Sequence, residues 1–152
     1  MKLGEALTQR SQLQKRFGEL RERIAGSVFA QEGESPPEDP KALLSELEAV
    51  AAELESLIAG INRANLTTTL ADGRTLTDAL ARRDHLTILH SALQKIANAA
   101  SESQTRYSNT EIKMVRMLDV PALRQRADEL AKERRELDAQ LQEKNWLTDL
   151  PS

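Results

Sequence analysis

The sequence of 152 residues has no cysteine and only four aromatic residues. The lack of cysteine excludes disulfides, thiol catalysis and cysteine-based zinc sites. With so few aromatic residues, the core must consist of leucine, isoleucine and alanine. No stretch approaches the roughly 18 consecutive apolar residues of a membrane span, and the start, MKLGEALTQR, lacks the apolar region of a secretory signal. We therefore expect a cytoplasmic protein with no membrane partner.

The chain also lacks an excess of positive charge, since its formal net charge is −3. Binding to nucleic acid without sequence preference requires a basic surface and usually stacking aromatics, so we expect no nucleic-acid partner. The mixed-sign run Lys132–Glu136 is typical of a solvated helix face.

The chain has only two histidines. His85 and His90 are five residues apart, which on one helix separates them by about 140°, so they cannot bind one ion together. We expect His90 to border the core. No catalytic residue, cofactor or metal is predicted, and the sequence favours a role other than catalysis.

What the sequence does contain is apolar side chains at helical spacing. In residues 43–61 they repeat at intervals of 4-3-4-3-4, at Leu43, Leu47, Val50, Leu54, Leu57 and Ile61. Such a stripe needs a partner helix to cover it, and similar stripes occur before and after it. The sequence therefore predicts a mainly α fold, with four long helices in a bundle and a small β-hairpin or strand element, forming a single domain over residues 1–152.

Capping residues predict where these helices begin and end. Asp39 directly precedes Pro40, and Asp119 lies two residues before Pro121. An aspartate followed closely by proline is typical of a helix start. Gly26 is a suitable residue for ending the first helix. We expect helices over about 2–25, 40–65, from Thr75 or Thr77 to an end between 101 and 108, and 119–146.

Two segments predict the β element. Residues 66–76 are rich in threonine and contain Asp72-Gly73, the usual dipeptide of a tight hairpin turn. Residues 111–118, EIKMVRML, alternate in a way that favours a strand.

Polar side chains adjoin the apolar rows of two predicted helices. Asp138, Gln142 and Asn145 share a face of the last helix, and Asn62 and Asn65 share one near the end of the second. Buried amides need hydrogen-bond partners, so these residues form either a network that fixes the helix register or a polar pocket for a ligand. We expect Asp138 to be ionised and paired with an arginine. The candidate pocket comprises Asn62, Asn65, Arg83, Asp84, Arg106, Asp138, Gln142, Asn145 and Trp146.

Six segments, taken in order, carry a resemblance to a known family. They are QEGE (31–34), EDP (38–40), LIAGINRAN (57–65), DGRTLTDALARRD (72–84), RYSNTEIK (106–113) and LDAQLQEKNW (137–146). Together they resemble a small bacterial family of uncharacterised proteins often labelled septicolysin, over nearly the whole chain. The label implies a pore-forming cytolysin. No apolar hairpin in the sequence could span a bilayer, and the resemblance implies no catalytic residue.

The leading hypothesis is a cytoplasmic helical scaffold or interaction protein that forms a homo-oligomer. The second predicted helix has Leu44, Ala51 and Ile58 beside its main stripe, and an apolar surface this wide can contact two neighbours. A small-ligand-binding protein or enzyme that uses the Asn, Arg and Asp pocket is an alternative. Further alternatives are a prefoldin-like holdase, suggested by helices joined through a hairpin, and a cytolysin.

Overall fold

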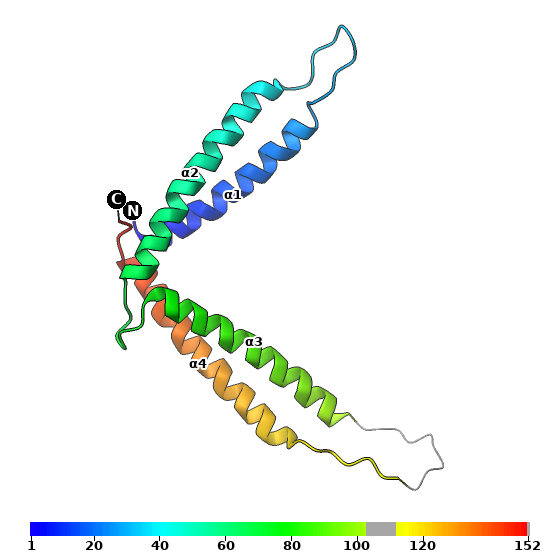
Figure 1. The fold of residues 1–152 in the computed structure, drawn as a ribbon, viewed down its shortest axis with the longest axis vertical. Coiled ribbons are helices and arrows are strands. Elements are labelled where there is room, and N and C mark those ends of the chain that lie inside the picture. The colour runs from blue at the N-terminus through cyan, green and yellow to red at the C-terminus, as the bar shows by residue number, and fades with distance from the viewer. Residues whose placement is uncertain (103–111, 152) are drawn as a thin grey trace. The chain divides into compact units, whose positions relative to one another are not determined.

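The computed structural model of the protein describes residues 1–102 and 112–151. Within these residues the chain forms four helices, α1 (Leu3–Ala25), α2 (Pro40–Thr67), α3 (Leu76–Ser101) and α4 (Val120–Leu147) (Figure 1). The mainly α class predicted from the sequence is confirmed, and each helix begins and ends within a few residues of its expected bounds. Over the described part of the chain, no helix is both long enough and apolar enough to cross a membrane.

The predicted capping residues start two of the helices. The Asp39 carboxylate accepts a hydrogen bond from the Lys41 backbone N–H at 3.0 Å, and Pro40 occupies the first turn of α2. The Asp119 carboxylate accepts from the Ala122 N–H at 3.2 Å at the start of α4. Both are local interactions, which is why the sequence indicates them.

The expected hairpin at residues 66–76 is a tight turn with little β structure. Gly73 has a positive φ of 86°, as a residue without Cβ allows, and the Leu70 N–H donates to the Arg74 carbonyl at 2.8 Å. The β pairing on the two sides of the turn consists of one isolated antiparallel bridge between Thr69 and Thr75. The prediction of a turn is therefore correct, whereas the structure has no ladder of two strands at these residues.

The prediction of a strand at residues 111–118 is wrong. Residues 112–118 have no regular secondary structure, and Glu111 lies outside the described residues. Their side chains are exposed, Ile112 and Met114 among them. Alternating apolar residues form a strand only where another strand offers its backbone N–H and C=O groups. In the part of the chain that the structure describes, no strand does so.

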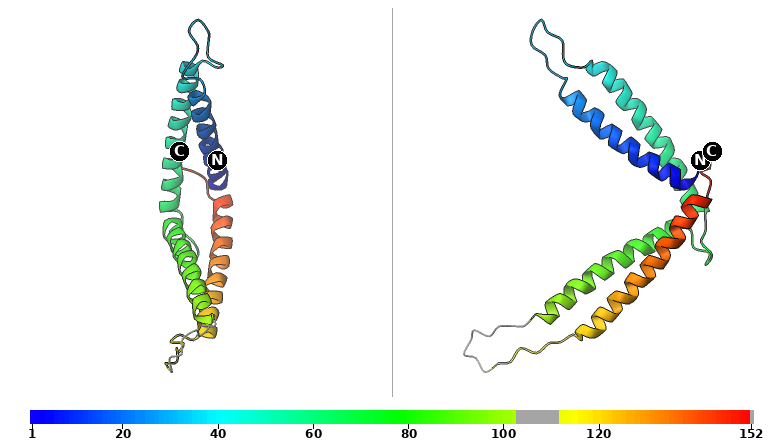
Figure 2. Two further views of the ribbon diagram at one scale, coloured as in Figure 1. Left: turned by 90° about the vertical axis from the view of Figure 1, so that its right-hand side faces the viewer. Right: turned by 180° about the vertical axis from the view of Figure 1, so that it is seen from behind.

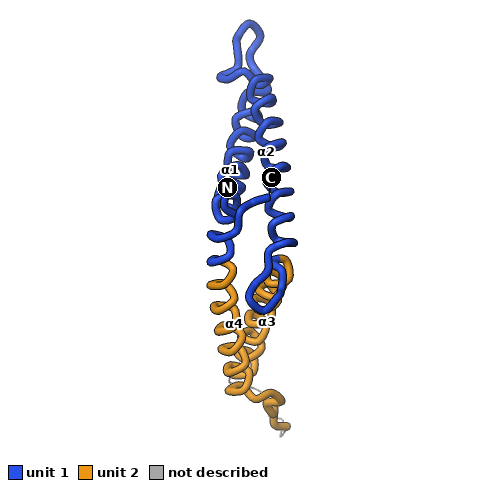
Figure 3. The backbone as a smooth tube through the Cα atoms, turned by 90° about the vertical axis from the view of Figure 1, so that its left-hand side faces the viewer, with its two compact units in different colours: residues 1–76, 142–152 blue, residues 77–141 orange. Residues whose placement is uncertain are grey.

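The chain divides into two compact units, which Figure 3 shows in different colours. Unit 1 comprises Met1–Leu76 and Gln142–Ser152, and unit 2 comprises Thr77–Leu141. The single domain expected from the sequence stays a prediction.

Unit 1 contains the antiparallel pair α1 and α2, which lie side by side in Figures 1 and 2. Each helix contributes one row of buried residues at intervals of seven. These rows are Ala6, Leu13 and Leu20 in α1, and Leu43, Val50, Leu57 and Ala64 in α2. Three polar pairs cross the helix pair along one flank: Gln9–Glu53, Arg16–Glu46 and Arg23–Glu38.

The two ends of the chain meet within unit 1. The Leu3 N–H donates to the Thr148 carbonyl and the Leu150 N–H to the Met1 carbonyl, both at 2.8 Å. The Lys2 ammonium and the Asp149 carboxylate form an ion pair, also at 2.8 Å. The side chain of Leu150 lies against the backbone of Gly60 in α2. The C-terminal segment is thus held by backbone pairing, an ion pair and apolar contact.

Unit 2 contains α3 and α4 up to Leu141. Its buried residues are Ala79, Leu86 and Ala97 in α3, and Ala127, Leu130, Leu137 and Leu141 in α4. Arg82 pairs with Glu133, and Arg124 donates to the Asn98 side chain at 3.3 Å. Arg82 precedes Asn98 in α3, whereas their partners follow the reverse order in α4, so the two helices are antiparallel.

Candidate functional site

The two helix pairs share one arrangement of rows, which positions the candidate site. In α2, Glu46 and Glu53 lie three residues after a buried residue and form the cross-helix polar pairs. In α3, Arg82 lies three residues after buried Ala79 and pairs with Glu133 of α4. We call this side of each pair the closed flank. Residues four after a buried one lie on the other side, which we call the open flank.

The open flanks of the two units differ in chemistry. In α2, the row four residues after the buried row is apolar and contains Leu47, Leu54 and Ile61. The equivalent row of α3 contains Arg83, His90 and Ala97, and that of α4 contains Ala127 and Arg134. Polar residues therefore share these rows with small ones. Polar groups at such positions weaken helix packing unless they have partners. We call Arg83, His90, Arg134 and the neighbouring Asp138 the polar seam.

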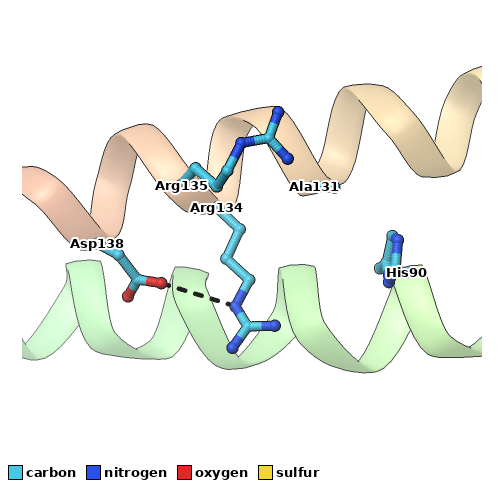
Figure 4. A pocket seen from close by; sticks show the side chains of 5 residues that line it. All are labelled: His90, Ala131, Arg134, Arg135 and Asp138. Atoms are coloured by element: carbon cyan, nitrogen blue, oxygen red, sulfur yellow. Dashed lines mark ion pairs between the residues drawn. The ribbon is translucent and has the colours of Figure 1, made fainter.

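One carboxylate lies between two arginines in this seam. Asp138 Oδ1 is 3.6 Å from Arg83 Nη1, across the helix pair, and Asp138 Oδ2 is 3.8 Å from Arg134 Nε, one turn earlier in α4. Figure 4 shows the second pair, with Arg134 extending from α4 toward α3. Both distances exceed those of a hydrogen bond. The Arg83 Nε also lies 4.0 Å from Asp84 Oδ1.

A cavity of about 220 Å³ adjoins the seam, lined by His90, Ala131, Arg134, Arg135 and Asp138. Figure 4 shows His90 on α3 and the other four residues on α4. The volume is below the 300–1,000 Å³ that is usual for drug-sized ligands. Over residues 1–102 and 112–151, no three His, Asp or Glu side chains gather as metal ligands would. The arrangement therefore suits a small anion better than a metal ion or a large cofactor.

The structure places the predicted pocket residues in different units. Arg83, Asp84 and Asp138 belong to unit 2, where Arg83 and Asp138 come together and Asp84 is exposed. The remaining described members belong to unit 1: Asn62, Asn65, Gln142, Asn145 and Trp146. Arg106 lies outside the described residues.

The unit 1 members differ in exposure. Asn62 and Gln142 are exposed, whereas Asn65 and Asn145 are half-buried. The indole of Trp146 lies against Gly4, where an added Cβ would come within 3.1 Å of the ring, although most of the indole remains exposed. This close approach explains the small residue at position 4.

Sequence reasoning missed the arginines that line the cavity. Arg134 and Arg135 stand in a run of mixed charge, which indicates a solvated face when the helix is considered by itself. Ala127, Arg134 and Leu141 lie seven residues apart in α4, and both Ala127 and Leu141 are buried. This spacing would have placed Arg134 in a row whose other members are buried. His90, expected to border the core, is half-buried beside the cavity.

Comparison with known proteins places the chain in a family. The model of a Family of unknown function (DUF6847) matches residues 10–150. The chain belongs to this family. It is also similar to a solved structure described as a functionally unknown conserved protein from Corynebacterium diphtheriae, with 40% identity, 99% of each chain covered and a TM-score of 0.89.

These matches support the helical fold and describe no activity. Comparison with curated proteins gives no match. Neither the family nor the solved structure bears on the septicolysin resemblance. The function must therefore be argued from the surfaces and side chains of this chain.

Proposed function

We propose that this protein is a self-associating helical interaction protein, and that the open flank of unit 1 is its contact surface. The observation that carries the proposal is an exposed apolar row on α2, formed by Leu44, Ala51 and Ile58 at intervals of seven residues. Leu44 is 47% exposed and Ile58 is 37% exposed. Apolar residues at this spacing on one helix face are typical of a helix–helix contact.

The apolar surface continues from this row into the core of unit 1. Leu47 and Leu54 are only half-buried, and each lies four residues before a member of the exposed row, about 40° away around the helix. Phe17 and Ile24 of α1 are half-buried as well. The helix pair therefore has one closed flank with polar pairs and one open flank where its core is incompletely covered.

A second copy of the chain is the partner that the exposed row fits. In a two-fold symmetric contact the same surface meets itself, so the apolar row of one copy would cover that of the other. The formal charges of α1 (+2) and α2 (−2) include Arg16, Arg23 and Glu46, which already pair on the closed flank within one copy. Apolar burial, rather than charge, would therefore stabilise the contact.

The prefoldin-like alternative depended on a hairpin between helices. Since residues 66–76 form a turn with one isolated bridge, that support is removed. A cytoplasmic location stays a prediction from composition.

Sedimentation equilibrium at micromolar concentration tests the proposal. We expect a species of twice the 16.9 kDa chain mass or a multiple of it. Ile58→Glu should shift the distribution to the monomer, because it places a charge in the contact. Leu66→Glu is the matched control, since Leu66 is an exposed apolar residue of α2 outside this row. A monomeric wild-type chain, or equal dissociation by both variants, would contradict the proposal.

A further inference from the structure

We infer that the polar seam of unit 2 and Arg135 form a binding site for a small, doubly charged oxyanion, either a phosphate group or a dicarboxylate. The ligand would occupy the cavity between α3 and α4, with Arg134, Arg135 and His90 around it and Arg83 beside it. This site is separate from the apolar surface proposed for self-association, and it does not depend on that proposal.

Three members of the polar seam occupy rows that are apolar in the other helix pair. A helix pair is stabilised by apolar residues in the rows that face the partner helix, as Leu47, Leu54 and Ile61 do in α2. In unit 2, Arg83, His90 and Arg134 replace apolar residues in the equivalent rows of both helices. The replacement removes apolar burial from two facing helices at the same level and places the guanidinium groups at the partly exposed edge of the helix pair, with 38% of the Arg83 side chain and 45% of the Arg134 side chain exposed.

The cluster has a net positive charge. Arg83, Arg134 and Arg135 contribute three positive charges against one negative charge from Asp138, and exposed Asp84 adds a second near Arg83 alone. The local charge is thus positive in a chain whose formal net charge is −3. The excess is two charges when Asp138 alone is counted and one charge when Asp84 is counted as well, so an oxyanion would neutralise it in whole or in large part.

The arginines of the cluster have hydrogen-bond donors available for a ligand. Each guanidinium carries five N–H donors, yet the structure gives those of Arg83, Arg134 and Arg135 no hydrogen bond to any residue it describes. Their contacts with Asp138 are longer than hydrogen bonds. Planar guanidinium groups match the oxygen spacing of phosphate and carboxylate, to which they donate in pairs.

The cavity is partly open to solvent, and its volume indicates which anions it can surround. A volume of about 220 Å³ accommodates a phosphate group or a short dicarboxylate, whereas ligands of nucleotide size need larger pockets. His90 adds a ring nitrogen that donates a hydrogen bond in either its neutral or its charged form. The site therefore combines charge, donors and a restricted volume suited to a small oxyanion.

Calorimetric titration of the full chain tests the inference, with inorganic phosphate and succinate as separate probes at constant ionic strength. We expect saturable binding of at least one probe. Phosphate binding alone would identify a phosphate-group site, and succinate binding alone a dicarboxylate site. No saturable binding of either probe would overturn the inference.

Variants separate this site from general charge screening. Arg134→Gln should weaken binding of the probe about tenfold or more, as expected for the loss of charged hydrogen bonds. Arg126→Gln removes the same charge from an exposed position of α4, where Arg126 pairs with Glu129, and should leave the affinity unchanged. Equal weakening by both variants would overturn the inference.

Asp138→Asn distinguishes a binding site from a network that only holds the helices together. If the site binds anions, removing the Asp138 charge frees Arg83 and Arg134 and the probe binds more tightly. If the residues serve packing alone, the variant lowers the melting temperature and neither it nor the wild-type chain binds the probe saturably. Circular dichroism confirms that each variant remains helical before titration, and a folded variant without tighter binding counts against the inference.

Discussion

Arg82 and Glu133 form a two-point hydrogen-bonded pair between α3 and α4, with Nε–Oε1 at 2.9 Å and Nη2–Oε2 at 3.0 Å. The pair occupies the closed flank of unit 2, as Arg16 and Glu46 do in unit 1. Both helix pairs therefore use ion pairs on one flank and expose different chemistry on the other. The open flank of unit 1 is apolar and that of unit 2 is cationic, which supports separate roles for the two.

The Arg82–Glu133 pair should contribute little to stability despite its geometry. The side chains are 38% and 43% exposed, and solvent screens such pairs. A double-mutant cycle with Arg82→Ala and Glu133→Ala should give a coupling free energy of about 0.2–1 kcal/mol. The free energies of unfolding come from urea denaturation. A coupling well above this range would show that the pair is shielded from water.

Two glycines in helices should respond differently to alanine. Gly18 of α1 has open space where a Cβ would stand, so Gly18→Ala should stabilise the protein by up to about 1 kcal/mol through helix propensity. At Gly60 of α2, the added Cβ would lie 3.0 Å from the Leu150 side chain. Gly60→Ala should therefore stabilise less, or destabilise, because Leu150 must move.

Thermal unfolding of both glycine variants measures the difference. Gly60→Ala in a chain that also carries Leu150→Ala is the control, since it removes the side chain that resists the new Cβ. The alanine at position 60 should then recover most of the helix-propensity gain. Identical effects of Gly18→Ala and Gly60→Ala in the wild-type background would mean that Leu150 does not press on α2.

The buried row of α4 should dominate the stability of unit 2. Leu130 is 1% exposed, and Leu130→Ala should lower the free energy of unfolding by about 2–5 kcal/mol through lost burial and the cavity left behind. Ile88 of α3 is 71% exposed, so Ile88→Ala should change it by no more than about 0.5 kcal/mol. Chemical denaturation followed by circular dichroism compares the two. Similar losses would contradict the assignment of the buried row.

The helices were predictable because their signals are local. Asp39 with Pro40 and Asp119 with Pro121 determine helix starts within a few residues, and the interval between apolar residues shows each helix's buried face. The conformation of residues 112–118 was not predictable in the same way, because a strand requires a partner that its own sequence does not contain.

The candidate site was partly predictable. Asp138 and Arg83 adjoin apolar rows, and the expectation that an arginine meets this carboxylate agrees with their distance of 3.6 Å. The charged neighbours of Arg134 along the chain indicate a solvated position instead. Its place in the seam depends on how α3 and α4 are aligned with each other, and a single helix does not contain that information.

The acid stability of unit 1 should depend on Glu38. The Arg23 guanidinium donates to the Glu38 carboxylate and lowers the pKa of that carboxyl below its ordinary value, first through the hydrogen bond and then through charge. A lowered pKa in the folded state means that the stabilisation is present above the ordinary carboxyl pKa of about 4.3. The stabilisation is lost as the pH falls through the lower, folded-state pKa.

Thermal unfolding between pH 7 and pH 3 measures this dependence. The melting temperature of the wild-type chain should fall more steeply below about pH 4.3 than that of Glu38→Gln, in which the titrating group is absent. Glu55→Gln is the matched control, because Glu55 is exposed on α2 and forms no ion pair with any residue in the described ranges. Its profile should follow the wild type. If Glu38→Gln followed the wild type as closely as Glu55→Gln does, the Arg23–Glu38 pair would have no part in the acid sensitivity.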